Sequence, residues 1–252
     1  MYVSDVVSSR LVSRPVLLAI RILFAIFTIV IMFWKISMDG PAYFRYLTTL
    51  SWTGIVIYYI VVVAVSLTYR NSKSEKEELP TWVSYLIQFT FSTSQMLPLI
   101  VTIIFWTLLR YFLAYADTSI VLFLMVTPHV ANLFIAQVEL WLTKQKLPLS
   151  RIAYTLLAIL AYTILSWILN YCFGVEFPYR FFQDLLDIRA TPGTSIGWSI
   201  AFLCIFFIMS LCIWAEARLR DYLMDRLFPR SDVVIDEPLN IPPKRIEMSA
   251  MV

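Results

Sequence analysis

The chain contains six apolar runs, each long enough to cross a bilayer as a helix. They cover Val16–Trp34, Leu47–Leu67, Met96–Tyr115, Ile120–Leu142, Ile152–Phe173 and Ile196–Ala215. A transmembrane helix needs about 20 mostly apolar residues, because each residue adds about 1.5 Å and the hydrocarbon core is about 30 Å thick. The sequence therefore predicts an all-α polytopic membrane protein, a bundle of six transmembrane helices.

The composition excludes an ordinary soluble domain and several kinds of site. Apolar residues make up 60% of the chain, and only one histidine and three cysteines are present. The cysteines lack C-x-x-C spacing, so we expect neither a disulfide framework nor a zinc site, and no cofactor. The net charge of +3 comes from short basic clusters between the apolar runs, which bear on membrane topology rather than on nucleic acid.

The basic residues also predict the orientation of the chain. Fourteen of the 20 Lys and Arg lie in the N-terminal tail, the second and fourth loops and the C-terminal flank. Cytosolic loops retain positive charge, so both termini are predicted to be cytosolic. We expect a cytosolic N-tail at 1–15 followed by a six-helix transmembrane domain at 16–225 that begins with a retained signal anchor. A polar, disordered cytosolic C-tail is expected at 226–252.

The third span is ambiguous because the apolar character extends far upstream of Met96. Residues 82–115 are almost unbroken, and as one helix they would measure roughly 50 Å. Pro98 follows the polar stretch "FSTSQM". The proline is expected to kink this helix, or to separate an interfacial helix over 82–95 from the span.

One polar stripe runs along the fourth apolar run. His129 lies about nine residues into it, near mid-membrane, and helical periodicity places Asn132 and Glu139 within an arc of about 80° around it. The stripe has two interpretations. It fixes helix packing through hydrogen bonds, or His129 acts as a general base, since imidazole titrates near physiological pH.

Hydroxyl groups open the second apolar run, and two of them share a face. Thr48 and Ser51 are three residues apart, which makes Thr48 a candidate nucleophile for a histidine base. Such hydroxyls also commonly bond back to the preceding helical turn, so a purely structural role stays open. For the intramembrane cation Arg21 we expect either pairing with Glu216 or snorkelling toward the cytosolic surface.

These segments together resemble one family, the androgen-induced membrane proteins and their Rolling-stone relatives. "YFRYLTTLSW" is similar to the segment that opens the family's second span, and "HVANLFIAQVEL" resembles its histidine segment, in which Glu follows His after ten residues. "IIFW" and "GVEFPYRFFQDL" look like two further blocks. The resemblance covers about residues 16–225. Val130 and Ala131 replace threonine-rich residues of the family, and the longer polar C-tail is similar to that of fungal members.

The resemblance implies an atypical intramembrane threonine hydrolase, in the endoplasmic reticulum membrane or another cell membrane, that cleaves fatty acid esters of hydroxy fatty acids or similar acyl esters. Thr48 would be the nucleophile and His129 the general base, with membrane lipids as partners and no nucleic acid. Asn132 or Ser51 would orient the imidazole or help to hold the oxyanion. Thr48 lies at the rim of its run and His129 deeper, so this mechanism needs a second helix that begins near Ala42 or a tilted fourth helix.

The alternative is a non-enzymatic membrane protein, of a lipid-binding, scaffold or transporter-like kind. His129 would then belong to a structural polar network, or would line a lipid or proton path together with Asn132 and Glu139. No paired, Gly- or Pro-interrupted spans indicate a transporter.

Overall fold

The computed structural model describes residues 1–70, 77–177 and 192–228. Six of its helices are long and apolar enough to cross a membrane. They are α2 (Arg14–Asp39), α3 (Leu47–Thr68), α4 (Thr81–Ile104), α5 (Ser119–Leu142), α6 (Ile152–Phe173) and α8 (Pro192–Leu227). These ranges contain no strand, so the predicted all-α six-helix membrane bundle is confirmed.

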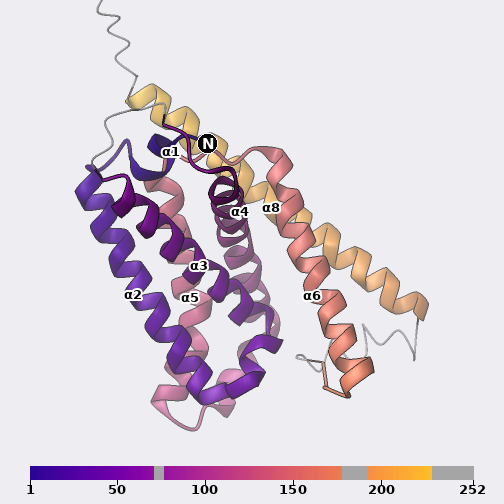
Figure 1. The fold of residues 1–252 in the computed structure, drawn as a ribbon. Helices are drawn as coiled ribbons and strands as arrows, with labels where there is room; N and C mark the ends of the chain where they lie inside the picture. Colours follow the sequence, from indigo (N-terminus) through magenta and orange to yellow (C-terminus); the bar gives the residue numbers. More distant parts are fainter. Residues whose placement is uncertain (71–76, 178–191, 229–252) are drawn as a thin grey trace, which may run out of the picture.

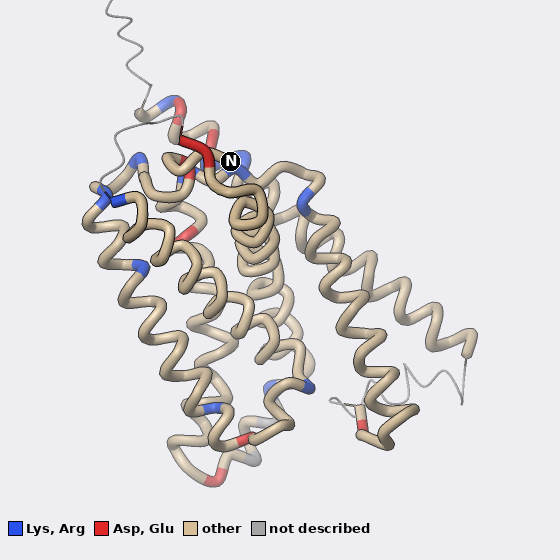
Figure 2. The backbone as a smooth tube through the Cα atoms, viewed as in Figure 1, with Lys and Arg blue, Asp and Glu red and all other residues tan. Residues whose placement is uncertain are grey.

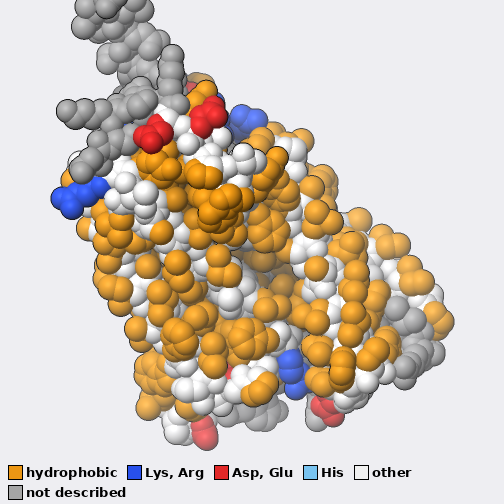
Figure 3. All heavy atoms as spheres, viewed as in Figure 1, with side chains coloured by type: hydrophobic (Ala, Val, Ile, Leu, Met, Phe, Trp, Pro, Cys, Tyr) orange, Lys and Arg blue, Asp and Glu red, His pale blue; other side chains and the backbone are white. Residues whose placement is uncertain are grey.

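Large apolar side chains cover the outside of the bundle. Leu23, Phe33, Trp82 and Phe173 are each more than 60% exposed, and Figure 3 shows hydrophobic side chains over most of one face, with charged ones near its two ends. Such a surface is unfavourable in water but suits hydrocarbon. The protein is a multi-pass integral membrane protein.

The third span is one helix that begins 15 residues earlier than Met96, so a separate interfacial helix over 82–95 is wrong. The polar stretch is accommodated because its side-chain hydroxyls donate to carbonyls of the preceding turn: Ser92 Oγ to Gln88 O, Thr93 Oγ1 to Phe89 O, and Ser94 Oγ to Phe91 O. Pro98 lies inside α4, and a π-helical turn, η2 (Phe105–Leu109), follows directly. A short 3-10 helix, η3 (Arg110–Tyr115), then leads toward α5.

The six helices form two groups. Helices α2 to α5 pack side by side around large buried side chains, including Trp52, Tyr58 and Phe91. Helices α6 and α8 pack on each other and on α4, and they diverge from the α2–α5 group away from the N-terminal end (Figure 1). The 3-10 helix η1 (Gly40–Arg45) links α2 to α3, and η4 (Leu149–Arg151) precedes α6.

The N-terminus and the end of α8 lie at the same end of the bundle, which we call the terminal end (Figure 1). Charged residues gather there and, more sparsely, at the opposite end (Figure 2). The N-tail contributes a short helix, α1 (Val3–Val7), whose Val3 and Val6 are buried against the bundle. The predicted C-tail lies outside the described residues from 229 onward, and residues 226–227 belong to α8.

Candidate functional site

A hydrogen bond between α3 and α5 sets the level at which the candidate residues meet. Both helices run from the opposite end toward the terminal end (Figure 1). Asn132 Nδ2 of α5 donates to Ser51 Oγ of α3 over 3.2 Å, and both side chains are buried. His129 and Thr48 each lie three residues before one of these partners. Three residues advance a helix by about 4.5 Å, so in parallel helices Thr48 and His129 lie at the same level.

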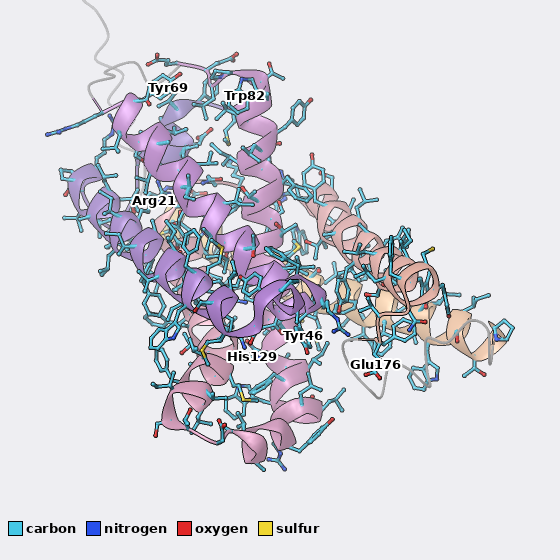
Figure 4. The ribbon with its side chains drawn as sticks, turned by 60° about the horizontal axis from the view of Figure 1, so that its bottom comes forward. Arg21, Tyr46, Tyr69, Trp82, His129 and Glu176 are labelled. Carbon is cyan, nitrogen blue, oxygen red and sulfur yellow. The ribbon has the colours of Figure 1, made fainter. Side chains whose placement is uncertain are left out.

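The sequence placed Thr48 at the rim of its apolar run and His129 deeper in the membrane. The observed register brings the two residues to one level although α3 does not begin earlier than its apolar run. The helix begins at Leu47, as the apolar run predicts, and not near Ala42. Ten residues of α5 precede His129, and they extend beyond the first turn of α3 toward the opposite end. His129 is therefore deep in its own helix and still level with the start of α3. Tyr46 packs with Phe105, which itself stacks on the His129 ring. Figure 4 labels Tyr46 and His129, which lie in the same part of the bundle.

Thr48 differs from its neighbouring threonine in its hydrogen bonding. The Thr49 hydroxyl donates to the carbonyl oxygens of Tyr43 and Tyr46, so it is committed to the η1–α3 junction. The Thr48 hydroxyl has no hydrogen-bond partner among the described residues, and its side chain lines a cavity. Of the two residues in the Thr-Thr pair, only Thr48 has a hydroxyl that is free to react.

The His129 ring is held by stacking and has one buried nitrogen without a partner. It stacks on Phe105 with the ring centroids 3.6 Å apart and an angle of 8° between the planes. The ring lies near the Val101 backbone, and its Nδ1 is buried without a hydrogen-bond partner in the described part of the chain. In the tautomer that carries the ring proton on Nε2, Nδ1 has the lone pair that a base requires.

Asn132 also carries an unused polar atom. Its Oδ1 is buried and, within the described residues, has no hydrogen-bond partner. An unsatisfied buried acceptor costs about 1–3 kcal/mol, and two such acceptors lie one turn apart on α5. Structural stripes usually satisfy their polar atoms, so these two free acceptors indicate a place where a ligand or water donates hydrogen bonds.

An apolar cavity adjoins Thr48. It lies between the start of α3, the end of α4, and helices α6 and α8, and Figure 3 shows the surface hollowed between the two helix groups. Its lining is mostly apolar and includes Val101, whose backbone lies near the His129 ring. The imidazole does not line this cavity, and no hydrogen bond joins Thr48 to His129 in the described ranges.

Glu139, the third member of the polar stripe, belongs to a separate group in which both of its carboxylate oxygens accept hydrogen bonds. Arg21 donates from Nη2 to Glu139 Oε1 over 2.5 Å, from Nε to Oε2 over 3.2 Å, and from Nη1 to the Val6 carbonyl over 2.7 Å. Tyr58 also donates to Glu139, and Gln145 donates to Tyr58. We call Arg21, Tyr58, Glu139 and Gln145 the terminal cluster; Figure 4 shows Arg21 well separated from His129 along the bundle.

The terminal cluster corrects one prediction and supports another. Arg21 was expected to pair with Glu216 or to snorkel toward the cytosolic surface, but it is fully buried and pairs with Glu139. Glu216 instead accepts hydrogen bonds from Gln137 and Trp141. The prediction that His129, Asn132 and Glu139 face inward together is confirmed, since each is at most 7% exposed. The sequence did not indicate Tyr58 or Gln145 as members of this group. Tyr58 is an aromatic residue in an apolar run and Gln145 lies in a loop, so neither contributes to a helical pattern of polar residues.

No family model, curated protein or solved structure matches this chain. The functional interpretation therefore depends on the geometry of Thr48, Ser51, His129 and Asn132, which we call the Thr48–His129 site.

Proposed function

We propose that this protein is an intramembrane lipid esterase in which Thr48 is the nucleophile and His129 the general base. The proposed substrates are fatty acid esters of hydroxy fatty acids or similar acyl esters, as in the androgen-induced and Rolling-stone proteins that the motifs resemble. One observation carries the proposal. The Ser51–Asn132 hydrogen bond holds a free threonine hydroxyl, on an apolar cavity, level with a buried imidazole that has a free nitrogen.

The chemistry follows from these atoms. Thr48 Oγ1 would attack the ester carbonyl while His129 Nδ1 accepts the hydroxyl proton, and that proton would then leave with the alcohol. The acyl-threonine would be hydrolysed by a water that gives its proton to the same nitrogen, and this proton would pass to Thr48 Oγ1 as the ester bond breaks and the fatty acid leaves. Proton transfer needs the two atoms within about 2.6–3.2 Å or one bridging water, so substrate binding would have to draw them together.

Asn132 and Ser51 would act as positioning residues. Their hydrogen bond aligns the two helices one turn from the reacting groups. The free Oδ1 of Asn132 is an acceptor, which suits holding a water or a substrate hydroxyl better than holding an oxyanion.

A second candidate function is lipid binding without hydrolysis. It is favoured by the missing Thr48–His129 hydrogen bond within the described residues and by the mostly apolar lining of the cavity. In that case the two free acceptors would bind a lipid hydroxyl, and no covalent intermediate would form.

The deciding experiment is hydrolysis by the purified full-length chain in nonionic detergent, offered a panel of branched and simple acyl esters. Thr48→Val removes the hydroxyl at nearly constant volume, and Thr163→Val is the matched control. Thr163 lines the same cavity, but its hydroxyl donates to the Ile159 carbonyl. We expect Thr48→Val and His129→Gln to lower kcat/KM by on the order of 10³-fold, with Thr163→Val near wild type.

A fluorophosphonate probe gives an independent readout of the nucleophile. The wild type should acquire a covalent adduct on the peptide that contains Thr48, and Thr48→Val should acquire none. Hydrolysis and labelling that survive in both Thr48→Val and His129→Gln would overturn the catalytic assignment. Lipid binding by a wild type that hydrolyses no ester in the panel would favour the second candidate.

We propose further that the terminal end faces the cytosol and that the protein resides in the endoplasmic reticulum. The clustering of basic residues in the segments of the terminal end supports this orientation. An N-glycosylation acceptor inserted beside Asp117, between η3 and α5, should be modified, whereas one at the N-terminus should not. The reverse pattern would invert the topology, and imaging of a tagged chain would test the organelle.

A further inference from the structure

A basic side chain, Arg45, lies at the opposite end of the bundle, beside the apolar cavity. Arg45 ends η1, two residues before the cavity-lining Leu47 and three before Thr48. Its carbonyl accepts a hydrogen bond from Tyr162 Oη over 3.1 Å, and Tyr162 lines the cavity. These contacts fix Arg45 at the rim of the cavity rather than on a distant loop.

The guanidinium of Arg45 is incompletely bonded. Nη2 donates to the Glu176 carbonyl over 2.5 Å, and Glu176 is followed by the cavity-lining Phe177. Nε is buried and has no hydrogen-bond partner, and no carboxylate pairs with Arg45 in the part of the chain that the structure describes. Arg45 is partly buried, whereas Arg21 and Arg220 are fully buried, and each of those two has an acidic partner and at least one backbone carbonyl.

An unpaired cation with a buried free donor at the rim of an apolar cavity is complementary to an anionic amphiphile. The apolar lining would hold a hydrocarbon chain, and the guanidinium would hold a planar anionic head group through charge-assisted hydrogen bonds. A neutral lipid would leave the cation unpaired, and a cationic one would be repelled. The fixed backbone contacts of Arg45 favour the anion, because they hold the guanidinium at the rim before the ligand arrives.

We propose that Arg45 selects the ligand of this protein, a single-chain amphiphile with an anionic head group at Arg45 and its acyl chain in the cavity between α3, α4, α6 and α8. The inference rests on the proposed lipid site but does not require hydrolysis. Carboxylate and phosphate share the recognising chemistry, so both are included in the test.

The experiment is photolabelling of the full-length protein in nonionic detergent with a diazirine probe of palmitic acid. Analogues of equal chain length with alkyl phosphate, alcohol and ammonium heads complete the set. We expect the acid or the phosphate to label at least about tenfold more than the alcohol at limiting concentration, the loss expected for one charge-assisted contact. The preferred anion identifies the head group. Labelled peptides should come from α6 near Tyr162 or from α8 near Phe202.

Three variants separate charge from structure. Arg45→Gln should lose the preference for the anion, Arg45→Lys should keep much of it, and Arg110→Gln should match the wild type. Arg110 is an exposed arginine in η3 and lies outside the cavity lining, so it controls for a general loss of positive charge. Size-exclusion profiles verify that each variant is folded.

Two outcomes would overturn the proposal. One is equal labelling of the wild-type protein by the acid, phosphate and alcohol probes. This result can be interpreted without any variant. The other is labelling that maps to the groove between α2 and α5 around Phe27 and Phe123. Thr48→Val distinguishes this inference from the esterase proposal, because it should abolish hydrolysis and keep anion-selective labelling.

Discussion

The terminal cluster and the Thr48–His129 site both use helices α3 and α5, and they differ in how their α5 side chains are bonded. The cluster also includes Arg21 of α2 and Gln145, which follows α5. Glu139 receives hydrogen bonds from Arg21 and Tyr58, and the hydroxyl of Tyr58 is bonded to Gln145. Ten residues away on α5, His129 Nδ1 and the nearby Asn132 Oδ1 have no partner among the described residues. A buried polar group is tolerated in a membrane when it is satisfied. Stability therefore explains the bonded carboxylate of Glu139, although Gln145 Oε1 in the cluster also lacks a partner among the described residues. It does not explain the two free acceptors of the site.

The comparison teaches that burial alone does not identify a functional residue in a membrane helix. All three members of the polar stripe are equally hidden, but only two retain free acceptors. The cluster should therefore control stability and the site should control activity. The following substitutions test this division, beginning with the largest expected effect on stability.

Arg21→Met should destabilise the protein most, by about 3–5 kcal/mol, because it leaves Glu139 charged, buried and without its cation. The apparent free energy of unfolding in mixed micelles of nonionic detergent and SDS measures the change. Adding Glu139→Leu to this variant should restore part of the loss. A single variant as stable as the wild type would show that the cluster does not support the fold.

Tyr58→Phe should cost about 1.5–3 kcal/mol in the same assay, since it removes one hydrogen bond to a carboxylate and leaves Gln145 Nε2 without its acceptor. Tyr59→Phe is the matched control. Tyr59 is the adjacent buried tyrosine, and its hydroxyl makes only a long 3.4 Å hydrogen bond to the Ile135 carbonyl. Equal losses for the two variants would contradict the special role of Tyr58.

The Thr48→Val and Thr49→Val variants should differ in their free energy of unfolding by about 1–2 kcal/mol. Thr49→Val removes a hydroxyl bonded to two carbonyls and should destabilise by about that amount, whereas Thr48→Val removes an unpartnered hydroxyl and should change stability by less than about 0.5 kcal/mol. The activity assay should give the opposite order. A Thr48→Val variant that unfolds readily would mean that its hydroxyl has a structural partner.

His129→Phe should change stability by less than about 1 kcal/mol, although His129 is a buried polar residue. The substitution removes a nitrogen without a hydrogen-bond partner, and the new ring retains an aromatic surface against Phe105. Hydrolysis should nevertheless be abolished. A loss of stability as large as that of Arg21→Met would show that His129 supports the fold, as the terminal cluster does.

The six spans and the inward stripe of α5 were predictable from local properties. Bilayer thickness sets the length of an apolar helix, and helical periodicity sets which residues share a face. The start of α4 was missed because apolar scanning counts "FSTSQM" as polar, whereas its hydroxyls are satisfied by the helix itself. The partner of Arg21 was missed because residues 118 apart in the chain carry no signal of their contact.

The sequence by itself determined a six-helix membrane protein, because hydrocarbon solvation and helix geometry act on each segment separately. Only the tertiary structure decided which polar residues are satisfied and which are free, since that depends on which helices are neighbours and in what register. The Ser51–Asn132 contact brings Thr48 and His129 to one level, and the Arg21–Glu139 pair removes Glu139 from the site. Both result from packing between helices, which no single segment encodes.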